Sequence, residues 1–119
     1  MSDPKYNVDM FLGTGGGPEG VLAACALDAY DCHFQGRFIF DNEKDITDAK
    51  VMGITDLNKK YELNEIVKGD SLFCASGITT GEVLNGIIIE GDKFISETLI
   101  THKNSNFKKI VKSINSINE

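Results

Sequence analysis

The stretch "NVDMFLGTGGGPEGVLAACALDAY" occupies residues 7–30, and it decides how the rest of the fold is interpreted. Val8, Met10 and Leu12 stand at every second position, which predicts a strand over residues 7–13. A glycine-rich loop follows, and Pro18 then suits the first position of a helix because its φ is already close to the helical value. Good helix formers continue to about Asp31. The sequence therefore predicts a strand, a glycine loop and a helix in succession.

Three explanations fit the loop "GTGGGPEG" at residues 13–20. The first is a tight turn that needs glycine for its dihedral angles. The second is a dinucleotide site, because residues 15–20 match G-x-G-x-x-G and Asp41 lies about 20 residues further on, where an acid binds ribose. The second explanation has a difficulty. Glu19 falls in the first turn of the helix, beside the backbone N–H groups that would bind a pyrophosphate, and two anions there repel each other.

The third explanation places a divalent cation between Glu19 and a phosphate. A helix N-terminus favours the ionised carboxylate, which is a hard oxygen ligand for Mg²⁺ or Mn²⁺. The glycine amides then hold phosphate oxygens while the metal ion neutralises charge. This explanation accounts for a negative side chain inside an anion-binding loop, which the other two do not.

Several motifs in order resemble the C-terminal half of class II fructose-1,6-bisphosphatase, the bacterial type related to the lithium-sensitive inositol phosphatase superfamily. The motifs are "GTGGGPEGVLAACAL", "QGRFIF", "MGITDLNKKY", "VKGDSLFCASGITTGEVLNGI" and "ETLITHKNS". The resemblance covers about residues 6–105. It implies hydrolysis of fructose 1,6-bisphosphate to fructose 6-phosphate in gluconeogenesis, with Mg²⁺ or Mn²⁺ as cofactor.

The resemblance also assigns residues. The glutamate of the Gly-Gly-x-Pro-Glu-Gly motif is a metal ligand in that family, here Glu19, and the glycine three positions earlier contacts substrate, here Gly16. Thr14 and Gly15 are expected to shape the same site. The family's other metal-binding acids lie in an N-terminal half that has no counterpart here. Residues 1–119 are therefore expected to be one C-terminal domain of a longer two-domain phosphatase, and no catalytic residue is assigned within them.

The expected partners are the sugar bisphosphate, the missing N-terminal half and further copies of the same protein. An isolated chain is expected to be inactive. The alternative function is a non-catalytic nucleotide- or phosphosugar-binding α/β module, which rests on the G-x-G-x-x-G match and Asp41.

Composition narrows the class of protein. The net charge is −6 and Arg37 is the one arginine, which argues against nucleic acid or an anionic membrane as a partner. No apolar run approaches the roughly 18 residues of a membrane span, so a cytoplasmic location is expected. The odd number of cysteines, Cys25, Cys32 and Cys74, fits no disulfide framework or zinc pattern, and inert buried thiols are expected.

The remaining segments predict an α/β fold with a mixed β-sheet flanked by helices. Strands are expected at residues 36–41 and 71–76, a polar loop at 42–48, a short helix from Leu63 closed by Gly69, a hairpin at 85–102 around Glu90–Lys93, and an amphipathic helix from Phe107 to Ile117.

The other polar candidates are interpreted structurally. Residues 76–82, "SGITTGE", are expected to form a turn, with anion binding as the alternative. Asp56 is expected to cap a turn, and His33 and His102 to be surface or packing residues. The expected solvent-facing charges are Asp45, Asp48, Lys108, Lys109 and Lys112.

Overall fold

The structure is a computed structural model that describes residues 7–117. The helices are α1 (Gly17–Asp28), α2 (Glu43–Val51) and α3 (Leu63–Ile66), and the strands are β1 (Gln35–Gly36), β2 (Tyr61–Glu62), β3 (Leu72–Ser76), β4 (Ile88–Glu90), β5 (Lys93–His102) and β6 (Phe107–Ser116). Helices flank sheets, so the α/β class is confirmed, and every pair of described strands is antiparallel.

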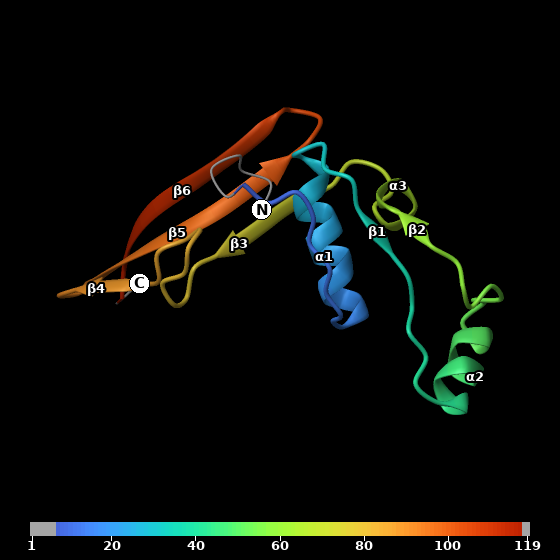
Figure 1. Cartoon of the computed structure of the whole chain (residues 1–119). Coiled ribbons are helices and arrows are strands. Elements are labelled where there is room, and N and C mark those ends of the chain that lie inside the picture. Colours follow the sequence, from blue (N-terminus) through green and yellow to red (C-terminus); the bar gives the residue numbers. More distant parts are fainter. Residues whose placement is uncertain (1–6, 118–119) are drawn as a thin grey trace.

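A four-stranded sheet is the largest unit of the fold, and β5 is its central strand (Figure 1). β6 pairs with β5 over its whole length, while β3 and β4 share the opposite edge of β5. The predicted strand at residues 71–76 and the predicted hairpin are confirmed. In the hairpin Glu90 pairs with Lys93, and Gly91 adopts a φ of 65°, which glycine takes without steric cost.

The predicted C-terminal helix is wrong, because residues 107–116 form β6. Phe107, Ile110, Val111 and Ile114 fit helical spacing, but three of these four side chains are β-branched, which favours a strand. The turn before β6 decides between the two. The N–H of Asn106 donates to the carbonyl of Lys103 at 2.8 Å, and Asn106 has a φ of 50°. This turn sends the chain back along β5.

The helix predicted after Pro18 is confirmed as α1, which packs against β3. Ala24 and Ala29 are buried, at 0% and 5% exposure. Lys103, in the β5–β6 turn, reaches the end of α1 and lies 2.9 Å from the Asp28 carboxylate. The small alanine side chains therefore allow α1 to lie close to the sheet, and the ion pair fixes its C-terminal end.

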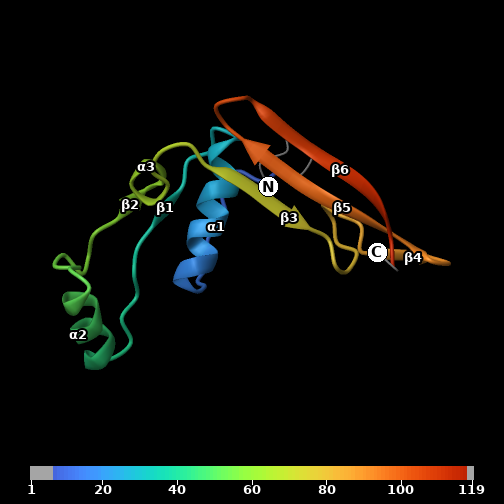
Figure 2. The same cartoon turned by 180° about the vertical axis from the view of Figure 1, so that it is seen from behind.

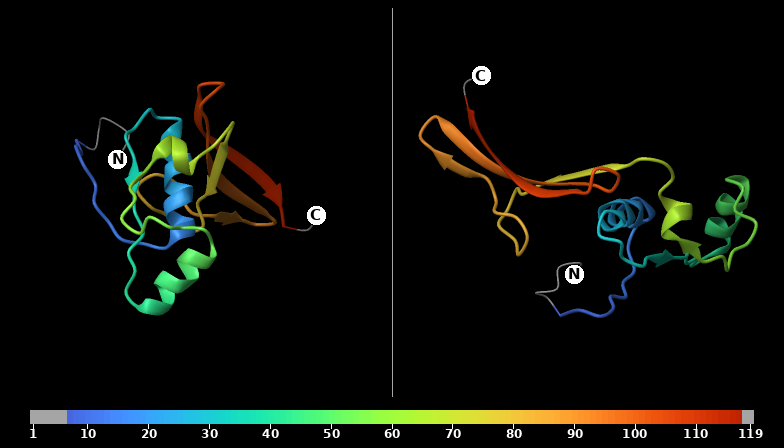
Figure 3. Two further views of the ribbon diagram at one scale, coloured as in Figure 1. Left: turned by 90° about the vertical axis from the view of Figure 1, so that its right-hand side faces the viewer. Right: turned by 90° about the horizontal axis from the view of Figure 1, so that it is seen from above.

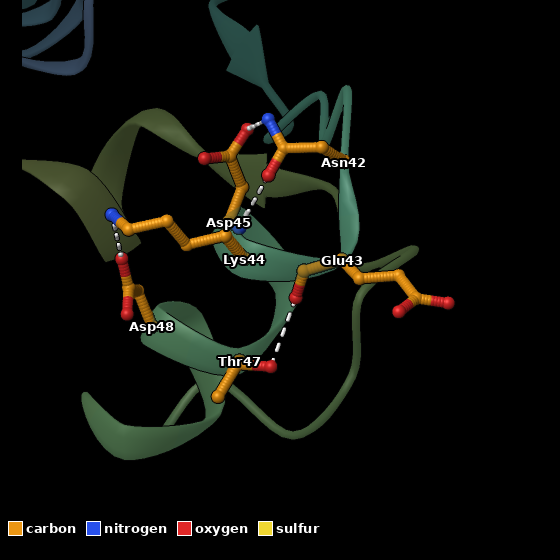
Figure 4. Close-up of polar contacts among 6 residues, drawn as sticks. All are labelled: Asn42, Glu43, Lys44, Asp45, Thr47 and Asp48. Atoms are coloured by element: carbon orange, nitrogen blue, oxygen red, sulfur yellow. Dashed lines mark hydrogen bonds and ion pairs between the residues drawn. The ribbon is translucent and has the colours of Figure 1, made fainter.

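The polar loop predicted at residues 42–48 is wrong, because these residues begin α2 (Figure 4). The Asn42 side chain accepts from the N–H of Asp45 at 3.0 Å and donates to its carboxylate at 2.9 Å. Lys44 and Asp48 form an i,i+4 ion pair at 3.0 Å. An asparagine cap with a short acid three residues later is a helix-start signal, which the local charge density concealed.

The strand predicted at residues 7–13 is absent, and that at 36–41 is reduced to the two-residue β1, which pairs with β2. Phe38 and Ile39 are 46% and 59% exposed. A strand forms only where another strand accepts its hydrogen bonds, and the partner of Gly36 is Tyr61, the first residue of β2. The short helix after Leu63 is confirmed as α3, but it ends at Ile66 rather than at Gly69.

The molecule has two sides about α1 (Figure 3). The four-stranded sheet lies on one side, and the segment before α1 and the segment containing β1 lie on the other. Figure 2 shows that β1, β2, α2 and α3 form an arm away from that sheet. Among residues 7–117 the buried apolar side chains are alanines only: Ala24, Ala29 and Ala49.

Candidate functional site

The glycine loop has no regular secondary structure and leads into the N-terminus of α1. Gly16 is the N-cap residue, with φ −68° and ψ 154°, and no side chain caps the helix. Pro18 has no N–H, and the first intrahelical bond is made by Gly20, whose N–H donates to the Gly16 carbonyl at 3.1 Å. Within the described residues, the N–H groups of Gly17 and Glu19 have no acceptor. Two donors are thus available to an anion.

The glycines of the loop are not required by the dihedral angles of this chain. Positive φ occurs at Gly53, Gly69 and Gly91 but at no glycine between residues 13 and 20. A Cβ added at Gly15 or Gly17 would meet nothing within 4 Å. The structure therefore gives no support to the tight-turn explanation, and these two positions need glycine only if something outside the chain approaches them.

Glu19 lies in the first turn of α1 and folds back over the loop. Its carboxylate is so close to Gly16 that a Cβ at Gly16 would collide with Oε2. Glu19, Thr14, Gly15 and Gly16 are all exposed. The sequence-predicted site residues are thus neighbours on one accessible surface, and Gly16 is the one loop glycine whose missing side chain makes room for the carboxylate.

One carboxylate fits a divalent cation as a single ligand but does not complete a site. In the part of the chain that the structure describes, no three His, Cys, Asp or Glu side chains are grouped so that they could hold a metal ion. Glu19 is an accessible hard oxygen donor beside free N–H groups, which suits a cation shared with a phosphate. A complete metal site would need further ligands from outside residues 7–117.

The dinucleotide explanation lacks its structural context. That site needs a strand directly before the loop and a parallel neighbouring strand. Residues 7–16 form no strand, the described sheets are antiparallel, and Asp41 follows five residues after the end of β1. Asp41 therefore does not occupy the position of a ribose-binding acid.

The second glycine-flanked segment, expected to be a turn at residues 76–82, lies mostly in an irregular loop between β3 and β4. Glu97 on β5 accepts from the backbone N–H and the side-chain amide of Asn85, at 2.9 and 3.0 Å. These hydrogen bonds are the main reason that the pKa of Glu97 lies below its usual value. Gly86 donates to Thr80 Oγ1 at 3.0 Å. Asn85 and Thr80 are thus engaged in hydrogen bonds within the protein.

His102 belongs to a network that the sequence did not reveal. Its Nε2 lies 2.7 Å from Asp70 Oδ1 and its Nδ1 lies 2.7 Å from Ser105 Oγ. The Asn104 side-chain amide also donates to Asp70, at 2.7 Å. The network ties the start of β3 to the β5–β6 turn, so His102 has a structural role, in line with the expected surface or packing residue. The spacing of His102 and Ser105 was visible in the sequence, but the distant Asp70 was not.

Of the predictions for the other side chains, some are confirmed and some are wrong. Asp56 caps its turn, accepting from the N–H of Asn58 at 3.0 Å, and His33 is exposed, as expected. Cys25 and Cys32 are only half-buried and Cys74 is exposed on β3, so the expectation of buried thiols is wrong. The described residues contain no helix with both the length and the apolar content to cross a bilayer.

Comparison with known proteins identifies the family. The chain is similar over 103 residues to the D-fructose 1,6-bisphosphatase class 2/sedoheptulose 1,7-bisphosphatase of Prochlorococcus marinus (strain AS9601), with 36% identity over 75% of this chain and 31% of the relative. The protein of the same name from Synechococcus sp. (strain JA-2-3B'a(2-13)) is 33% identical over 90% of this chain and 35% of its own length.

The chain spans about a third of the length of these curated relatives. The family model for bacterial fructose-1,6-bisphosphatase, glpX-encoded, matches residues 1–116. That match contains the glycine loop, α1 and the whole four-stranded sheet. The chain therefore belongs to the bacterial, glpX-encoded fructose-1,6-bisphosphatase family.

Proposed function

We propose that this chain is the C-terminal domain of a metal-dependent sugar bisphosphatase. Its loop holds the phosphate of fructose 1,6-bisphosphate through backbone N–H groups and holds Mg²⁺ or Mn²⁺ through Glu19. The reaction is hydrolysis of a phosphate ester to fructose 6-phosphate and inorganic phosphate, a gluconeogenic step in the cytoplasm. The names of the relatives also include sedoheptulose 1,7-bisphosphatase, and that substrate belongs to the same proposal.

The single observation that carries the proposal is a glycine loop in which two glycines have no structural role within the described chain and two N–H groups lack acceptors there. Gly15 and Gly17 face open space, their dihedral angles suit any residue, and the N–H groups of Gly17 and Glu19 have no acceptor within the described residues. A glycine that neither dihedral angles nor packing requires is explained by a ligand that approaches the backbone closely.

Each residue has a definite part in this proposal. Gly16 contacts the substrate and leaves room for the Glu19 carboxylate, and Thr14 and Gly15 border the phosphate. A divalent cation, when bound, polarises the phosphoryl oxygens and lowers the pKa of a coordinated water. The chain supplies one ligand to it, so the other acids have to come from the remaining two thirds of the family fold.

The isolated chain is therefore expected to bind Mg²⁺ or Mn²⁺ weakly and to release no phosphate from fructose 1,6-bisphosphate. Isothermal titration of the metal ions and a phosphate-release assay on the purified chain measure both properties. Robust metal-dependent phosphate release by the 119-residue chain alone would overturn the proposal that its acids come from elsewhere.

The decisive experiment uses a fusion in which this chain replaces the matched part of the Prochlorococcus marinus relative. Glu19→Gln keeps the side-chain size and removes the charge that holds the cation, so phosphate release should fall about 100-fold or more. Glu43→Gln is the matched control, because Glu43 also lies in the first turn of a helix, α2, and is exposed. Its turnover should equal that of the unmodified fusion.

Glycine substitutions provide an independent test in the same fusion. Gly15→Ala and Gly81→Ala both place a methyl group in space that is open within this chain. Gly15→Ala should lower turnover because the methyl group occupies the phosphate position, whereas Gly81→Ala should not. Near-normal turnover in both Glu19→Gln and Gly15→Ala would show that the loop is not the phosphate and metal site.

A further inference from the structure

The surface of this chain is too large for its mass. The accessible surface is 9128 Å² for 13.0 kDa, whereas a folded chain of this mass exposes about 6,300 Å². The radius of gyration is 18.0 Å, against about 13.5 Å for a compact domain of this length. The excess area, on the order of 2,000–3,000 Å², matches one partner's share of a large obligate interface.

Six of the twenty exposed large apolar side chains among residues 7–117 lie on two segments with strand-like sequences. In the segment 8–12 the exposed fractions are Val8 44%, Met10 74%, Phe11 68% and Leu12 82%. In the segment 38–40, Phe38 and Ile39 are 46% and 59% exposed. Exposed apolar side chains on an extended segment indicate a surface that another element covers.

The backbone of both segments is also unpaired. The pairing of β1 with β2 ends at Gly36, and no backbone hydrogen bond joins residues 8–12 or 38–40 to any other segment within residues 7–117. Extended backbone with free N–H and carbonyl groups accepts an additional strand.

Both segments lie on the same side of α1, opposite the four-stranded sheet (Figure 3). One face of α1 therefore packs against β3 of the four-stranded sheet, and the other side carries two separate strand-like segments. Besides the two-residue pairing of β1 with β2, no sheet covers that side of α1 within residues 7–117.

We propose that the segments 8–12 and 38–40 are the docking edge for strands from the part of the class 2 bisphosphatase fold that this chain does not contain. The relatives are about three times longer, since the match covers 31% of the first of them. The incoming strands complete a second sheet on α1, through main-chain hydrogen bonds and through burial of the exposed apolar side chains.

This inference shares with the proposed function the idea that the rest of the fold completes the protein, but it concerns assembly and needs neither metal nor substrate. Glu19 lies outside both segments, so Glu19→Gln should dock normally. Normal docking with lost turnover, or lost docking with the loop intact, therefore separates the two proposals.

The test mixes the purified chain with the part of the Prochlorococcus marinus enzyme outside the matched region. Complex formation is measured by light scattering and titration calorimetry without metal, and amide hydrogen exchange locates the contact. We expect a one-to-one complex in which the amides of residues 38–40 become protected. Ile39→Asp and Met10→Asp should weaken binding about tenfold or more, because docking would bury an unpaired carboxylate.

Val51→Asp is the matched control. Val51 is 83% exposed on α2 and belongs to neither segment, so this variant should bind as the unmodified chain does. All three substituted side chains are exposed, so each variant should keep the circular dichroism spectrum of the parent chain. Absence of a complex, protection elsewhere only, equal weakening by all three variants, or self-association that protects residues 38–40 without the added piece would overturn the proposal.

Discussion

The crossing of the backbone at Gly86 allows a sharp prediction about the stability of this chain. Gly86 is buried where residues 77–80 pass residues 85–87, and its neighbour Ile87 donates from its N–H to the Ile78 carbonyl at 3.2 Å. A Cβ at Gly86 would lie 2.7 Å from the Thr80 nitrogen and 2.8 Å from the Ile78 oxygen. Both neighbours are backbone atoms, which cannot rotate away as a side-chain end can.

Gly86→Ala should therefore destabilise the chain by about 2–3 kcal/mol, at the upper end of the usual cost of overpacking. With a urea m-value of about 1.5–2 kcal/mol/M, the unfolding midpoint should fall by about 1–2 M. Circular dichroism in urea measures this midpoint.

The control is Gly81→Ala in the same loop, where a Cβ meets nothing within 4 Å and φ is not positive. This variant should be neutral or slightly more stable, because alanine restricts the unfolded chain. Equal urea unfolding midpoints for both variants would show that residues 77–80 do not pass as close to Gly86 as the structure places them.

Two further predictions concern charge and the site. The pKa of Glu97 is lowered from 4.5 mainly by the hydrogen bonds from Asn85, so its contribution to stability is present above pH 4.5 and is lost as the pH falls through the lower folded value. Acid titration of Glu97→Gln by circular dichroism should show a weaker loss of stability than the parent below pH 4.5. Gly16→Ala meets only the flexible end of Glu19, so the urea midpoint of the chain should barely change, while turnover of the fusion should fall because the carboxylate is displaced. A large loss of stability, or unchanged turnover, would contradict the placement of Glu19 over the loop.

Local signals explain which elements the sequence predicted. Pro18 and the alanine-rich run define α1 because helix starts depend on residues close in sequence, and Glu90–Lys93 defines a hairpin for the same reason. The cap at Asn42 was equally local, but seven consecutive residues with several charges were interpreted as loop. In that case the signal was present and the interpretation was wrong.

Non-local pairing explains most of the remainder. Residues 8–12 and 38–40 have sequences typical of strands. They have no strand partner within the described chain, so they do not form strands here. For the candidate site, the sequence predicted Glu19 at a helix N-terminus and the loop glycines beside it, and the structure brings these together. The His102 network was missed because Asp70 is 32 residues away along the chain.

The register of β6 allows one more test, which separates the observed strand from the helix that its spacing suggested. Lys112 lies directly opposite Glu97 on β5, whereas Lys109 lies opposite Ile100 and therefore on the other face of the sheet. In a helix both lysines would share the solvent-facing side, and reversing either charge would act alike. In the strand, Lys112→Glu puts two like charges opposite each other, which destabilises the pair. We expect the urea midpoint of Lys112→Glu to recover part of its loss when Glu97→Gln is added, since the repulsion is then gone. Lys109→Glu changes the net charge equally, and its midpoint should shift by the same amount with or without Glu97→Gln. Salt near 1 M should shrink the Lys112 coupling, because exposed charges are then screened. A coupling to Glu97 of equal size for both lysines would show that residues 107–116 do not pair with β5 in this register.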